Sequence, residues 1–515
     1  MENLTDVRAM ISFRSIPLYF LAGTLLFVAG KLFYNLFLHP LRKYPGPFLA
    51  GSTRVYYLWY DVRGLSHWKV NEWHQKYGPV IRIAPNELSY TDGRAWPAIY
   101  GFPNKEGTAG NFEKDPQWWN KTISGVVNIL DADDAGHRRM RRLQNPAFSD
   151  KALRAQESVI RGYAALLIHK LHGLCSSGGS SEDVGGAGAT VVDLTAWYNF
   201  TTFDVIGDLA FGEPFYCLQN AKWHWWLQAV FDIFKAGTML RAARRFPEPL
   251  ATLLCLFIPR KLIQTRKEQF VFGIERVNKR LEQTTDRPDF MSYILNAEGE
   301  KGMTLEEMYT AAQVLIVAGS ETSATALCGA TYLLLSNPAT LARLTAEVRG
   351  AFASEADILL QSTQALPYLS AVIEESLRLC PPGPGTFPRR VPEGGREVCG
   401  RFVPGGMTVG VHQVATHRSP ANFKEPLAFR PERWLGDPAF EGDDRACFHP
   451  FSFGPRNCIG KNLAYAETRT VLSRMVWNFD MKLHPDSVGW LDRQKTYTTW
   501  QKDEMKVEIK PRARV

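Results

Sequence analysis

The sequence predicts a mainly helical protein with small β-sheets, preceded by one helix that is long enough to cross a membrane. Three observations carry this prediction. An apolar stretch stands near the N-terminus, a long stretch without helix breakers occupies residues 305–336, and extended patterns such as residues 80–90 are short. The chain has 515 residues, of which 45% are hydrophobic and 22% are charged, so it can bury a large core.

Composition and cysteine spacing narrow the class of protein. The net charge of +8 is mild for this length, and the sequence has no nucleic-acid-binding signature. The eight cysteines are scattered without a C-x-x-C pair, which indicates reduced thiols rather than a disulfide framework or a zinc site. None of the eleven histidines stands in an H-E-x-x-H motif. We therefore expect a cytosol-facing protein without a nucleic-acid partner.

The apolar stretch from Ile16 to Leu38 predicts a membrane anchor in residues 1–38. Roughly 20 apolar residues span a bilayer, and Lys31 lies near enough to the end of the stretch to reach the interface. The alternative is a cleaved secretory signal, but the stretch is long and no small-residue cleavage site follows it. Residues 39–47 are basic and rich in proline, which predicts a stiff hinge on the cytosolic side.

Short elements and loops follow the hinge. Residues 66–77 have a helical pattern, and residues 80–90 predict a hairpin of two short strands. Residues 101–127 are irregular and rich in Gly, Pro and Trp, which favours a loop over a pocket. Residues 176–189 are rich in Ser and Gly, which predicts a flexible surface loop rather than a domain boundary.

A basic helix is predicted over residues 134–143. His137 and Arg141 are one helical turn apart and therefore share a face. Part of the arginine run is a solvated face, and the remaining arginines are candidates for contact with an acidic partner.

Two apolar segments are predicted to lie over the pocket. Residues 201–218 predict an apolar helix that is ended by Gly212 and Pro214. Residues 223–256 are aromatic and apolar, with a basic break at residues 241–245, and predict helices that roof the pocket and touch the membrane. Core packing alone explains their apolar residues equally well.

The longest predicted helix begins at a capping box, Thr304 with Glu307, and stops before Pro338. A helix over residues 305–336 is about 48 Å long at 1.5 Å per residue. Its middle, residues 311–335, is almost uncharged, which predicts burial.

The middle of this helix contains Ala318, Gly319, Glu321 and Thr322. A glycine and a buried carboxyl group are both unfavourable in a helix interior. One explanation is a packing notch with a satisfied glutamate. The other is that Gly319 leaves room for a diatomic ligand, while Glu321 and Thr322 form an acid–alcohol pair that delivers protons. The residues expected to line one face are Ala311, Leu315, Ala318 and Thr322.

Glu375 and Arg378 are three residues apart on a further predicted helix. Such a pair is ordinarily a surface ion pair of small energy. Here the surrounding run, residues 369–379, is apolar, which predicts that the pair is buried. Residues 381–388 are expected to be extended and to border the pocket, and the chain near residues 496–499 to return to it.

The segment from Phe451 to Gly460 holds Cys458 in a turn built from Gly454, Pro455 and Gly460. Backbone N–H groups around the sulfur and the start of the following helix favour a thiolate over a thiol. Arg456 can supply positive charge to an anionic ligand on the same side. Most of the other cysteines are read as small buried side chains, whereas Cys458 is a plausible axial thiolate ligand of haem iron.

This segment resembles the cysteine-ligand loop of the cytochrome P-450 family, the haem-thiolate monooxygenases. The matching positions are Phe451, Gly454, Arg456, Cys458 and Gly460. The resemblance extends over essentially the whole chain. It implies a mainly helical fold with small β-sheets, in which residues 48–515 form one catalytic domain behind the anchor and hinge.

The resemblance also implies roles for the other motifs. His137, Arg141 and Arg389, or the neighbouring Arg390, are expected to bind the haem propionates. Residues 318–323 match the oxygen-binding helix. Glu375 and Arg378 are expected to form a structural lock with Arg433. The full set of expected cofactor-binding residues is Cys458, Arg456, His137, Arg141, Arg389, Phe451, Gly319 and Ala318.

The reaction implied by the resemblance is reductive activation of O₂ at haem b, followed by insertion of oxygen into a C–H bond of a small apolar substrate. The sequence has no flavin or nicotinamide fingerprint, so electrons are expected from NADPH–cytochrome reductase, with cytochrome b5 as a further candidate donor. Alternatives are a desaturase or epoxidase, a haem carrier or sensor without oxidation, and a haem-thiolate isomerase or peroxide-using enzyme.

Two stretches, residues 39–47 and 201–218, are similar to fungal trichothecene hydroxylases and related mycotoxin-pathway oxidases. This similarity implies tailoring of a fungal secondary metabolite. Microsomal members of the family carry such an anchor, so we expect a single-pass protein of the endoplasmic reticulum membrane with its catalytic domain in the cytosol.

Overall fold

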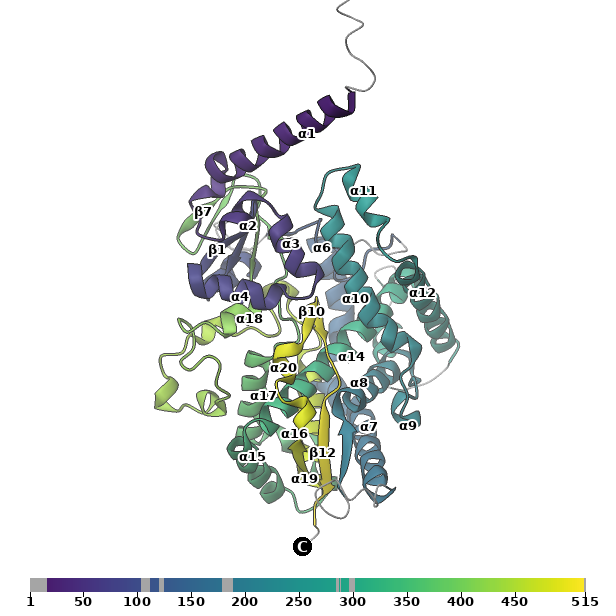
Figure 1. The fold of residues 1–515 in the computed structure, drawn as a ribbon. Coiled ribbons are helices and arrows are strands. Elements are labelled where there is room, and N and C mark those ends of the chain that lie inside the picture. Colours follow the sequence, from purple (N-terminus) through teal and green to yellow (C-terminus); the bar gives the residue numbers. More distant parts are fainter. Residues whose placement is uncertain are drawn as a thin grey trace, which may run out of the picture.

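The structure is a computed structural model, and it describes residues 16–102, 112–119, 125–177, 189–283, 287, 289–295 and 302–513. Helices form most of the body and the strands form small sheets, which confirms the predicted fold class (Figure 1). The loops predicted at residues 101–127 and 176–189 lie largely outside the described residues.

The helices differ widely in length. The longer ones are α1 (Ile16–Phe33), α4 (Ser66–Tyr77), α6 (Asp134–Gln144), α7 (Asp150–Ser177), α8 (Leu194–Phe211), α10 (Trp225–Arg244), α12 (Arg260–Leu281), α14 (Leu305–Leu335), α15 (Pro338–Ala351), α17 (Pro367–Leu379) and α19 (Lys461–Asn478). The shorter ones are α2 (Phe48–Ser52), α3 (Val55–Val62), α5 (Ala95–Tyr100), α9 (Cys217–Asn220), α11 (Leu250–Cys255), α13 (Phe290–Leu295), α16 (Leu360–Gln364), α18 (Gln413–His417) and α20 (Trp490–Arg493).

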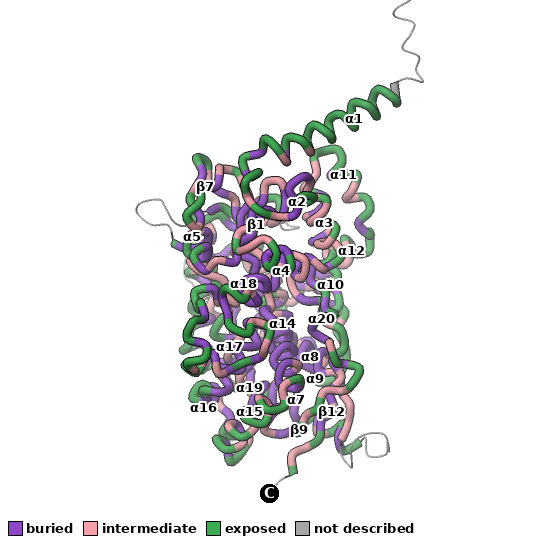
Figure 2. Tube along the Cα trace, turned by 60° about the vertical axis from the view of Figure 1, so that its left-hand side comes forward, coloured by how far each residue is buried: buried purple, intermediate pink, exposed green. Residues whose placement is uncertain are grey.

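Helix α14 is the central element of the body. Its predicted capping box is present: the Thr304 hydroxyl accepts from the Glu307 backbone N–H at 3.2 Å, and the Glu307 carboxylate accepts from the Thr304 N–H at 3.0 Å. Helices α8, α17 and α19 pack against α14, and both α14 and α8 are buried inside the body (Figure 2). The core therefore forms around the helix that carries the predicted oxygen-binding motif.

The largest sheet has the order β1 (Val80–Ala84), β2 (Glu87–Tyr90), β8 (Thr408–Val411), β5 (Arg389–Arg390) and β3 (Glu113–Lys114). Only β2 and β8 pair in parallel. The other sheets are β4 (Thr190–Asp193) with β12 (Lys506–Pro511) and β9 (Phe479–Leu483), β6 (Arg396–Val398) with β7 (Arg401–Val403), and β10 (Lys495–Tyr497) with β11 (Thr499–Gln501). Pairing of β3 with β5 places Lys114 opposite Arg389.

Two helix boundaries can be compared with the sequence prediction. Helix α8 begins at Leu194, where the Asp193 carboxylate accepts from the Thr195 N–H at 2.9 Å, and it ends at Gly212 with a φ of 72°. The predicted basic break at residues 241–245 coincides with the end of α10, which stops at Arg244 and is followed by α11 from Leu250. Basic side chains are favourable in the last turn of a helix, where they face the negative end of its dipole.

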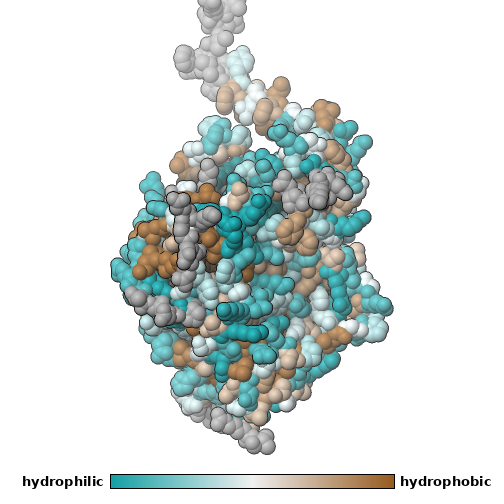
Figure 3. Space-filling view, turned by 180° about the vertical axis from the view of Figure 1, so that it is seen from behind, coloured by the Kyte–Doolittle hydropathy of each residue, from teal (hydrophilic) through white to brown (hydrophobic). Residues whose placement is uncertain are grey.

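The N-terminal helix projects from the body. Residues Leu18–Leu38 form a helix long and apolar enough to cross a membrane, with only 6% of that window buried. Figure 3 shows hydrophobic side chains on this helix above a largely hydrophilic body surface. Helix α14 has similar length and hydropathy, but 72% of its window is buried, so it is a core helix.

The segment after α1 is fastened to the body. Leu41 is fully buried, and the carbonyl oxygen of Pro45 accepts a hydrogen bond from the Arg82 N–H at 2.7 Å. A Cβ on Gly46 would lie 2.5 Å from the Arg82 carbonyl oxygen. Residues 39–47 are therefore a packed junction, not a free linker.

Candidate active site

Cys458 lies in a tight loop in front of α19. Its N–H donates to the Phe451 carbonyl oxygen at 2.9 Å. Gly454 has a φ of 74°, and a Cβ there would lie 2.0 Å from the Tyr100 carbonyl oxygen, so only glycine lets the loop pack against α5. Of the eight cysteines, all within the described residues, Cys458 alone is exposed. The loop thus presents one accessible sulfur.

The electrostatic environment of this sulfur is mixed. The surrounding protein raises the pKa of Cys458, while the Gly460 backbone hydrogen bond and the positive charges of Arg141 and Lys461 oppose that rise. These effects act on the sulfur in the absence of a metal ion. A coordinated metal ion deprotonates a thiol outright, so bound iron would favour the predicted thiolate.

Basic side chains gather near the loop, and one of them, Arg456, forms an ion pair with Asp134 at 2.8 Å. Arg389 is buried, and its Nε has no hydrogen-bond partner within the described part of the chain; the same holds for Nη1 of Arg456. Burial and the nearby Arg456 and Arg389 lower the pKa of Lys114 to about 6. Burial and Arg456 lower the pKa of His137 to about 4. These groups fit an anionic ligand, and the two propionates of haem have that chemistry.

The structure distinguishes between the two adjacent arginines of β5. Arg390 forms an ion pair with Asp115 at 3.3 Å, whereas no ion pair of Arg389 occurs among the described residues. Burial lowers the pKa of Arg389 to about 10, which marks a buried cation that lacks a partner. Arg389 is therefore the better candidate for a propionate.

Arg141 and Phe451 support the cysteine loop. Arg141 donates to the carbonyl oxygen of Asn457 at 2.5 Å and to its side-chain oxygen at 3.0 Å. The ring of Phe451 lies 5.1 Å from that of Tyr465. Both residues hold the backbone next to Cys458, a role that the sequence pattern alone does not distinguish from direct cofactor contact.

Helix α14 presents Ala318 and Thr322 on its open face. Ala318 is exposed and Thr322 half-buried, whereas Ala311 and Leu315 are buried. The Thr322 hydroxyl donates to the Ala318 carbonyl oxygen at 2.5 Å. The Thr322 hydroxyl thus lies one helical turn from an exposed alanine.

Gly319 has a different environment from the one predicted for a ligand site. A Cβ at this position would lie 2.6 Å from Cδ1 of Ile206 on α8. The packing explanation therefore applies to Gly319, because its missing side chain lets α8 approach α14.

Glu321 points away from Thr322 and forms a buried ion pair with Lys502, just after β11. The Lys502 ammonium group also donates to the Thr325 hydroxyl at 2.9 Å. Burial raises the pKa of Glu321, and Lys502 opposes the rise. The second carboxylate oxygen, Oε2, has no partner within the described residues. The predicted acid–alcohol pair therefore has no direct hydrogen bond among the described residues, and no sequence pattern pointed to Lys502.

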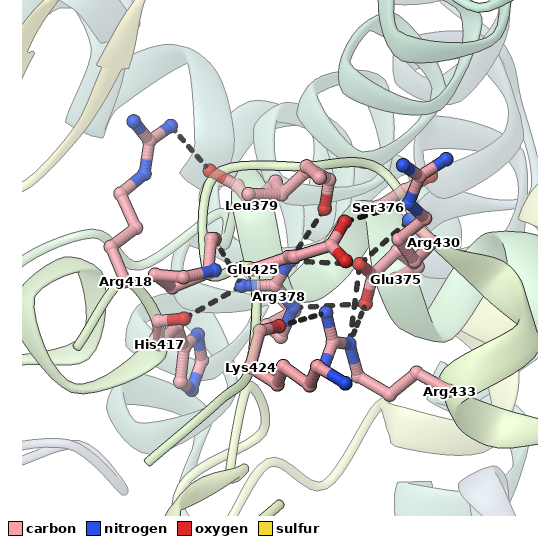
Figure 4. A network of polar contacts seen from close by, with 12 residues as sticks. Glu375, Ser376, Arg378, Leu379, His417, Arg418, Lys424, Glu425, Arg430 and Arg433 are labelled. Carbon is pink, nitrogen blue, oxygen red and sulfur yellow. Dashed lines mark hydrogen bonds and ion pairs between the residues drawn. The ribbon is translucent and has the colours of Figure 1, made fainter. Parts of the chain in front are cut away.

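The predicted lock of Glu375, Arg378 and Arg433 is present and fully buried (Figure 4). Glu375 accepts from Arg378 at 2.8 and 2.9 Å and from Arg433 at 3.2 Å. These arginines hold the pKa of Glu375 below its usual value despite burial. Asp443, which pairs with Arg433, and Trp434, which donates to Glu375 at 3.0 Å, complete the network and were not predicted.

An exposed cysteine in a glycine-framed loop, basic side chains near it and a buried helix with an open face suit a protein that binds haem. Comparison with known proteins agrees, because the family model for cytochrome P450 matches residues 45–508. The chain belongs to the cytochrome P450 family. It is an oxidoreductase of the monooxygenase type, and membership implies haem, a substrate and a redox partner that supplies electrons.

Several fungal proteins are similar over nearly the full chain. Cytochrome P450 monooxygenase aclL of Aspergillus oryzae is 47% identical, with 96% of this chain and 98% of the relative covered. Cytochrome P450 monooxygenase astJ of the same organism is 44% identical, with 94% of each chain covered. Averantin hydroxylase of Dothistroma septosporum is 41% identical, with 96% of this chain and 91% of the relative covered.

Proposed function

We propose that this protein is a haem-thiolate monooxygenase that hydroxylates a small, largely apolar substrate in fungal secondary-metabolite biosynthesis. The observation that carries the proposal is the accessible sulfur of Cys458 in its glycine-framed loop. The similarity to averantin hydroxylase over 96% of the chain supports hydroxylation as the reaction. A desaturase or epoxidase that uses the same oxidant is the alternative.

The cofactor of the proposed enzyme is haem b, with Cys458 as its axial iron ligand. Arg389, Arg456 and His137 are proposed to face the propionates, because Asp134, which pairs with Arg456, is the one acid among the electrostatic neighbours of His137 within the described residues, and Arg389 has no ion pair there. The bound haem supplies reductive O₂ activation, and the thiolate donates electron density that favours O–O cleavage. Arg141 and Phe451 keep the loop in place, while Glu375, Arg378 and Arg433 stabilise the fold around it.

Protons are proposed to reach the haem through the open face of α14. Thr322 is the hydroxyl on that face, and Ala318 leaves space next to it. Glu321 is proposed to assist this proton delivery from the buried side of α14, where Lys502 holds its carboxylate. A positioned acid of this kind contributes typically ~10² to 10⁴-fold to a rate.

Electrons are proposed to come from NADPH through NADPH–cytochrome reductase, with cytochrome b5 as a second donor. Arg138 and Arg142 on α6 are exposed and suit an acidic partner. Arg139 does not belong to that surface, because it pairs with Glu307 at the start of α14. No nucleic-acid role is proposed.

Residues 1–38 are proposed to anchor the protein in the endoplasmic reticulum membrane, with residues 39–47 as the junction and residues 48–515 as the cytosolic catalytic domain. Exposed apolar side chains near α11 lie at the same end of the molecule as α1 (Figures 1 and 2). They are Leu250, Leu253, Leu256 and Phe257. A protein shortened to start at Arg42 should bind haem and become extractable from microsomes by carbonate; retention would contradict the single anchor.

The proposed function is tested by co-expressing the full chain with a fungal NADPH–cytochrome reductase and profiling metabolites by mass spectrometry. A new product that is 16 mass units heavier than its precursor and depends on NADPH supports hydroxylation or epoxidation; structure determination of the product separates the two. A product two mass units lighter identifies a desaturase. A haem protein that consumes no NADPH with any candidate substrate would contradict monooxygenase activity.

A further inference from the structure

A polar cavity of about 60 Å³ lies between α3, α10, the segment before Arg389 and the turn between β10 and β11. Helix α3 and its N-cap contribute Arg54, Tyr57, Leu58 and Asp61, and α10 with the residue after it contributes Arg241 and Arg245. Thr496 and Thr498 enter from the C-terminal hairpin. The cavity is therefore built from parts of the chain that are far apart in sequence.

Most of the charges around this cavity are already paired. Arg54 pairs with Glu87, and Arg245 pairs with Asp115 at 2.8 Å. Arg241 and Asp61 are the exceptions, since no ion pair involves either of them within the described part of the chain. One cation and one carboxylate therefore face the same cavity without being joined.

Both groups have unused hydrogen-bonding capacity. Nη2 of Arg241 donates to the hydroxyls of Thr238 at 2.8 Å and Thr498 at 2.9 Å, but a guanidinium has five N–H donors. Asp61 accepts from the Ser66 hydroxyl at 3.0 Å, and a carboxylate can accept several more bonds. Burial lowers the pKa of Arg241 and raises that of Asp61, while the charge of each residue opposes the shift of the other. Burial remains the larger effect, so neither charge is fully compensated.

We propose that this cavity binds a hydroxyl group of the substrate, phenolic or alcoholic, with Arg241 donating to its oxygen and Asp61 accepting its hydrogen. This inference rests on the proposed monooxygenase function and names the polar group of its substrate. A hydroxyl is both donor and acceptor, so one group satisfies both side chains. A carboxylate would satisfy Arg241 but face the negative charge of Asp61.

The cavity lies next to the proposed haem site. Residues 383–388 line it and lead directly into Arg389. Trp118 lines it as well, only four residues after Lys114, the β3 residue paired with Arg389. The rings of Trp118 and Phe387 lie 6.0 Å apart, and the Arg241 guanidinium lies 4.8 Å from the Trp118 ring centroid. A hydroxyl bound here would thus have aromatic surface beside it.

The test compares three probes of one skeleton: naphthalene, 2-naphthol and 2-naphthoate. Each is titrated into the full-length ferric holoenzyme, and the dissociation constant is taken from the absorbance change of the haem. We expect 2-naphthol to bind roughly tenfold more tightly than naphthalene, since hydrogen bonds to charged groups have about this effect. We expect 2-naphthoate to bind no more tightly than naphthalene.

Arg241→Met and Asp61→Asn should each abolish the preference for 2-naphthol and leave naphthalene affinity unchanged. Lys235→Met, which removes an exposed cation from the same helix, is the matched control and should retain the preference. Equal affinities of the three probes in the wild-type protein would overturn the proposal, as would undetectable binding of 2-naphthol. Tightest binding of 2-naphthoate would identify an anion site instead.

Failure of the proposed hydroxyl site can be distinguished from failure of the proposed function. A protein whose reduced CO complex has the red-shifted band of thiolate-ligated haem retains the proposed chemistry, whatever the probes show. Loss of probe selectivity with that band intact therefore counts against the hydroxyl site alone.

Discussion

Arg378 and Arg389 are both buried arginines, yet their surroundings are opposite. Arg378 donates five hydrogen bonds, to both oxygens of Glu375 and to the carbonyl oxygens of His417, Pro426 and Ala428. For Arg389, no side-chain hydrogen bond or ion pair is found among the described residues, and its guanidinium lies 5.5 Å from the Tyr100 ring centroid. A buried charge without a partner is strongly unfavourable. Arg378 is thus part of the fold, while Arg389 requires a partner from outside the chain.

The same contrast separates two buried glutamates. Glu375 accepts from Arg378, Arg433 and Trp434, and its pKa is lowered. Glu467 on α19 has no ion pair within the described residues, and burial raises its pKa to about 8 although the Ser323 hydroxyl opposes the rise. Buried charged groups whose partners all lie within the chain therefore belong to the structural part of this molecule. Buried charged groups without such partners are those whose charge state or partner changes.

The largest expected effect is at Cys458 in the candidate active site. Cys458→Ala removes the one exposed thiol, so the reduced protein under CO should lose the red-shifted Soret band of thiolate-ligated haem completely. Cys255→Ala, at a partly buried thiol on α11, is the control and should keep the band. Retention of the band in Cys458→Ala would refute the ligand assignment.

Exchanging the two arginines for methionine tests the comparison directly. Arg378→Met leaves the buried Glu375 with a missing partner and should lower the free energy of unfolding by about 3–5 kcal/mol. Arg389→Met removes a cation that has no partner in the chain, so the stability of the haem-free protein should stay the same or rise. Its haem affinity, measured by transfer of haem to apomyoglobin, should fall.

The opposite pattern would break the comparison. If Arg389→Met destabilised the haem-free protein as much as Arg378→Met, Arg389 would be a structural residue. If both variants retained haem equally well, the propionate site would have to be sought among the other basic side chains.

Because of Glu467, we expect the free energy of unfolding to fall as the pH rises. Its folded pKa of about 8 lies above the usual value of 4.5, so between these values the folded state holds a proton that the unfolded chain has lost. The free energy of unfolding should therefore decrease by up to about 1.4 kcal/mol per pH unit in this window. Glu467→Gln should remove that part of the slope in urea unfolding, while Glu268→Gln, at an exposed position, should not.

The same distinction explains which parts were predictable from sequence. Cys458 with its glycines, the capping box of α14 and the pair Glu375–Arg378 are local patterns, so spacing alone locates them. Lys502 and Lys114 meet Glu321 and Arg389 through tertiary contacts between segments far apart in the chain, and Asp443 meets Arg433 across an irregular loop. No periodicity signals such contacts.

Gly319 and the end of α10 show a further limit of prediction from sequence. The sequence identified Gly319 as unusual, but the reason for it, the side chain of Ile206 on α8, depends on how two helices pack. The basic run at residues 241–245 does lie where α10 ends, since the last turn of a helix favours positive charge, but its contacts could not be predicted from the charge pattern. Local composition therefore predicted that these positions matter without predicting what they contact.

The smallest expected effect on stability, and a selective one on reaction outcome, is at Thr322. Its hydroxyl bonds only to the Ala318 carbonyl oxygen among the described residues, so Thr322→Ala should fold and bind haem and substrate normally. Because the hydroxyl is proposed to order protons for O–O cleavage, the variant should still consume NADPH. Product formed per NADPH should fall, and hydrogen peroxide should rise.

Two variants separate this role from that of the neighbouring ion pair. Lys502→Met leaves Glu321 buried without its cation, so it should lower stability as well as coupling, in contrast to Thr322→Ala. Thr310→Val, near the start of α14 where the hydroxyl bonds to the Glu307 carbonyl oxygen at 3.0 Å, should leave the product-to-NADPH ratio unchanged. Unchanged coupling in Thr322→Ala would show that this hydroxyl only satisfies the helix backbone, and Glu321 with Lys502 would then be the remaining route for protons.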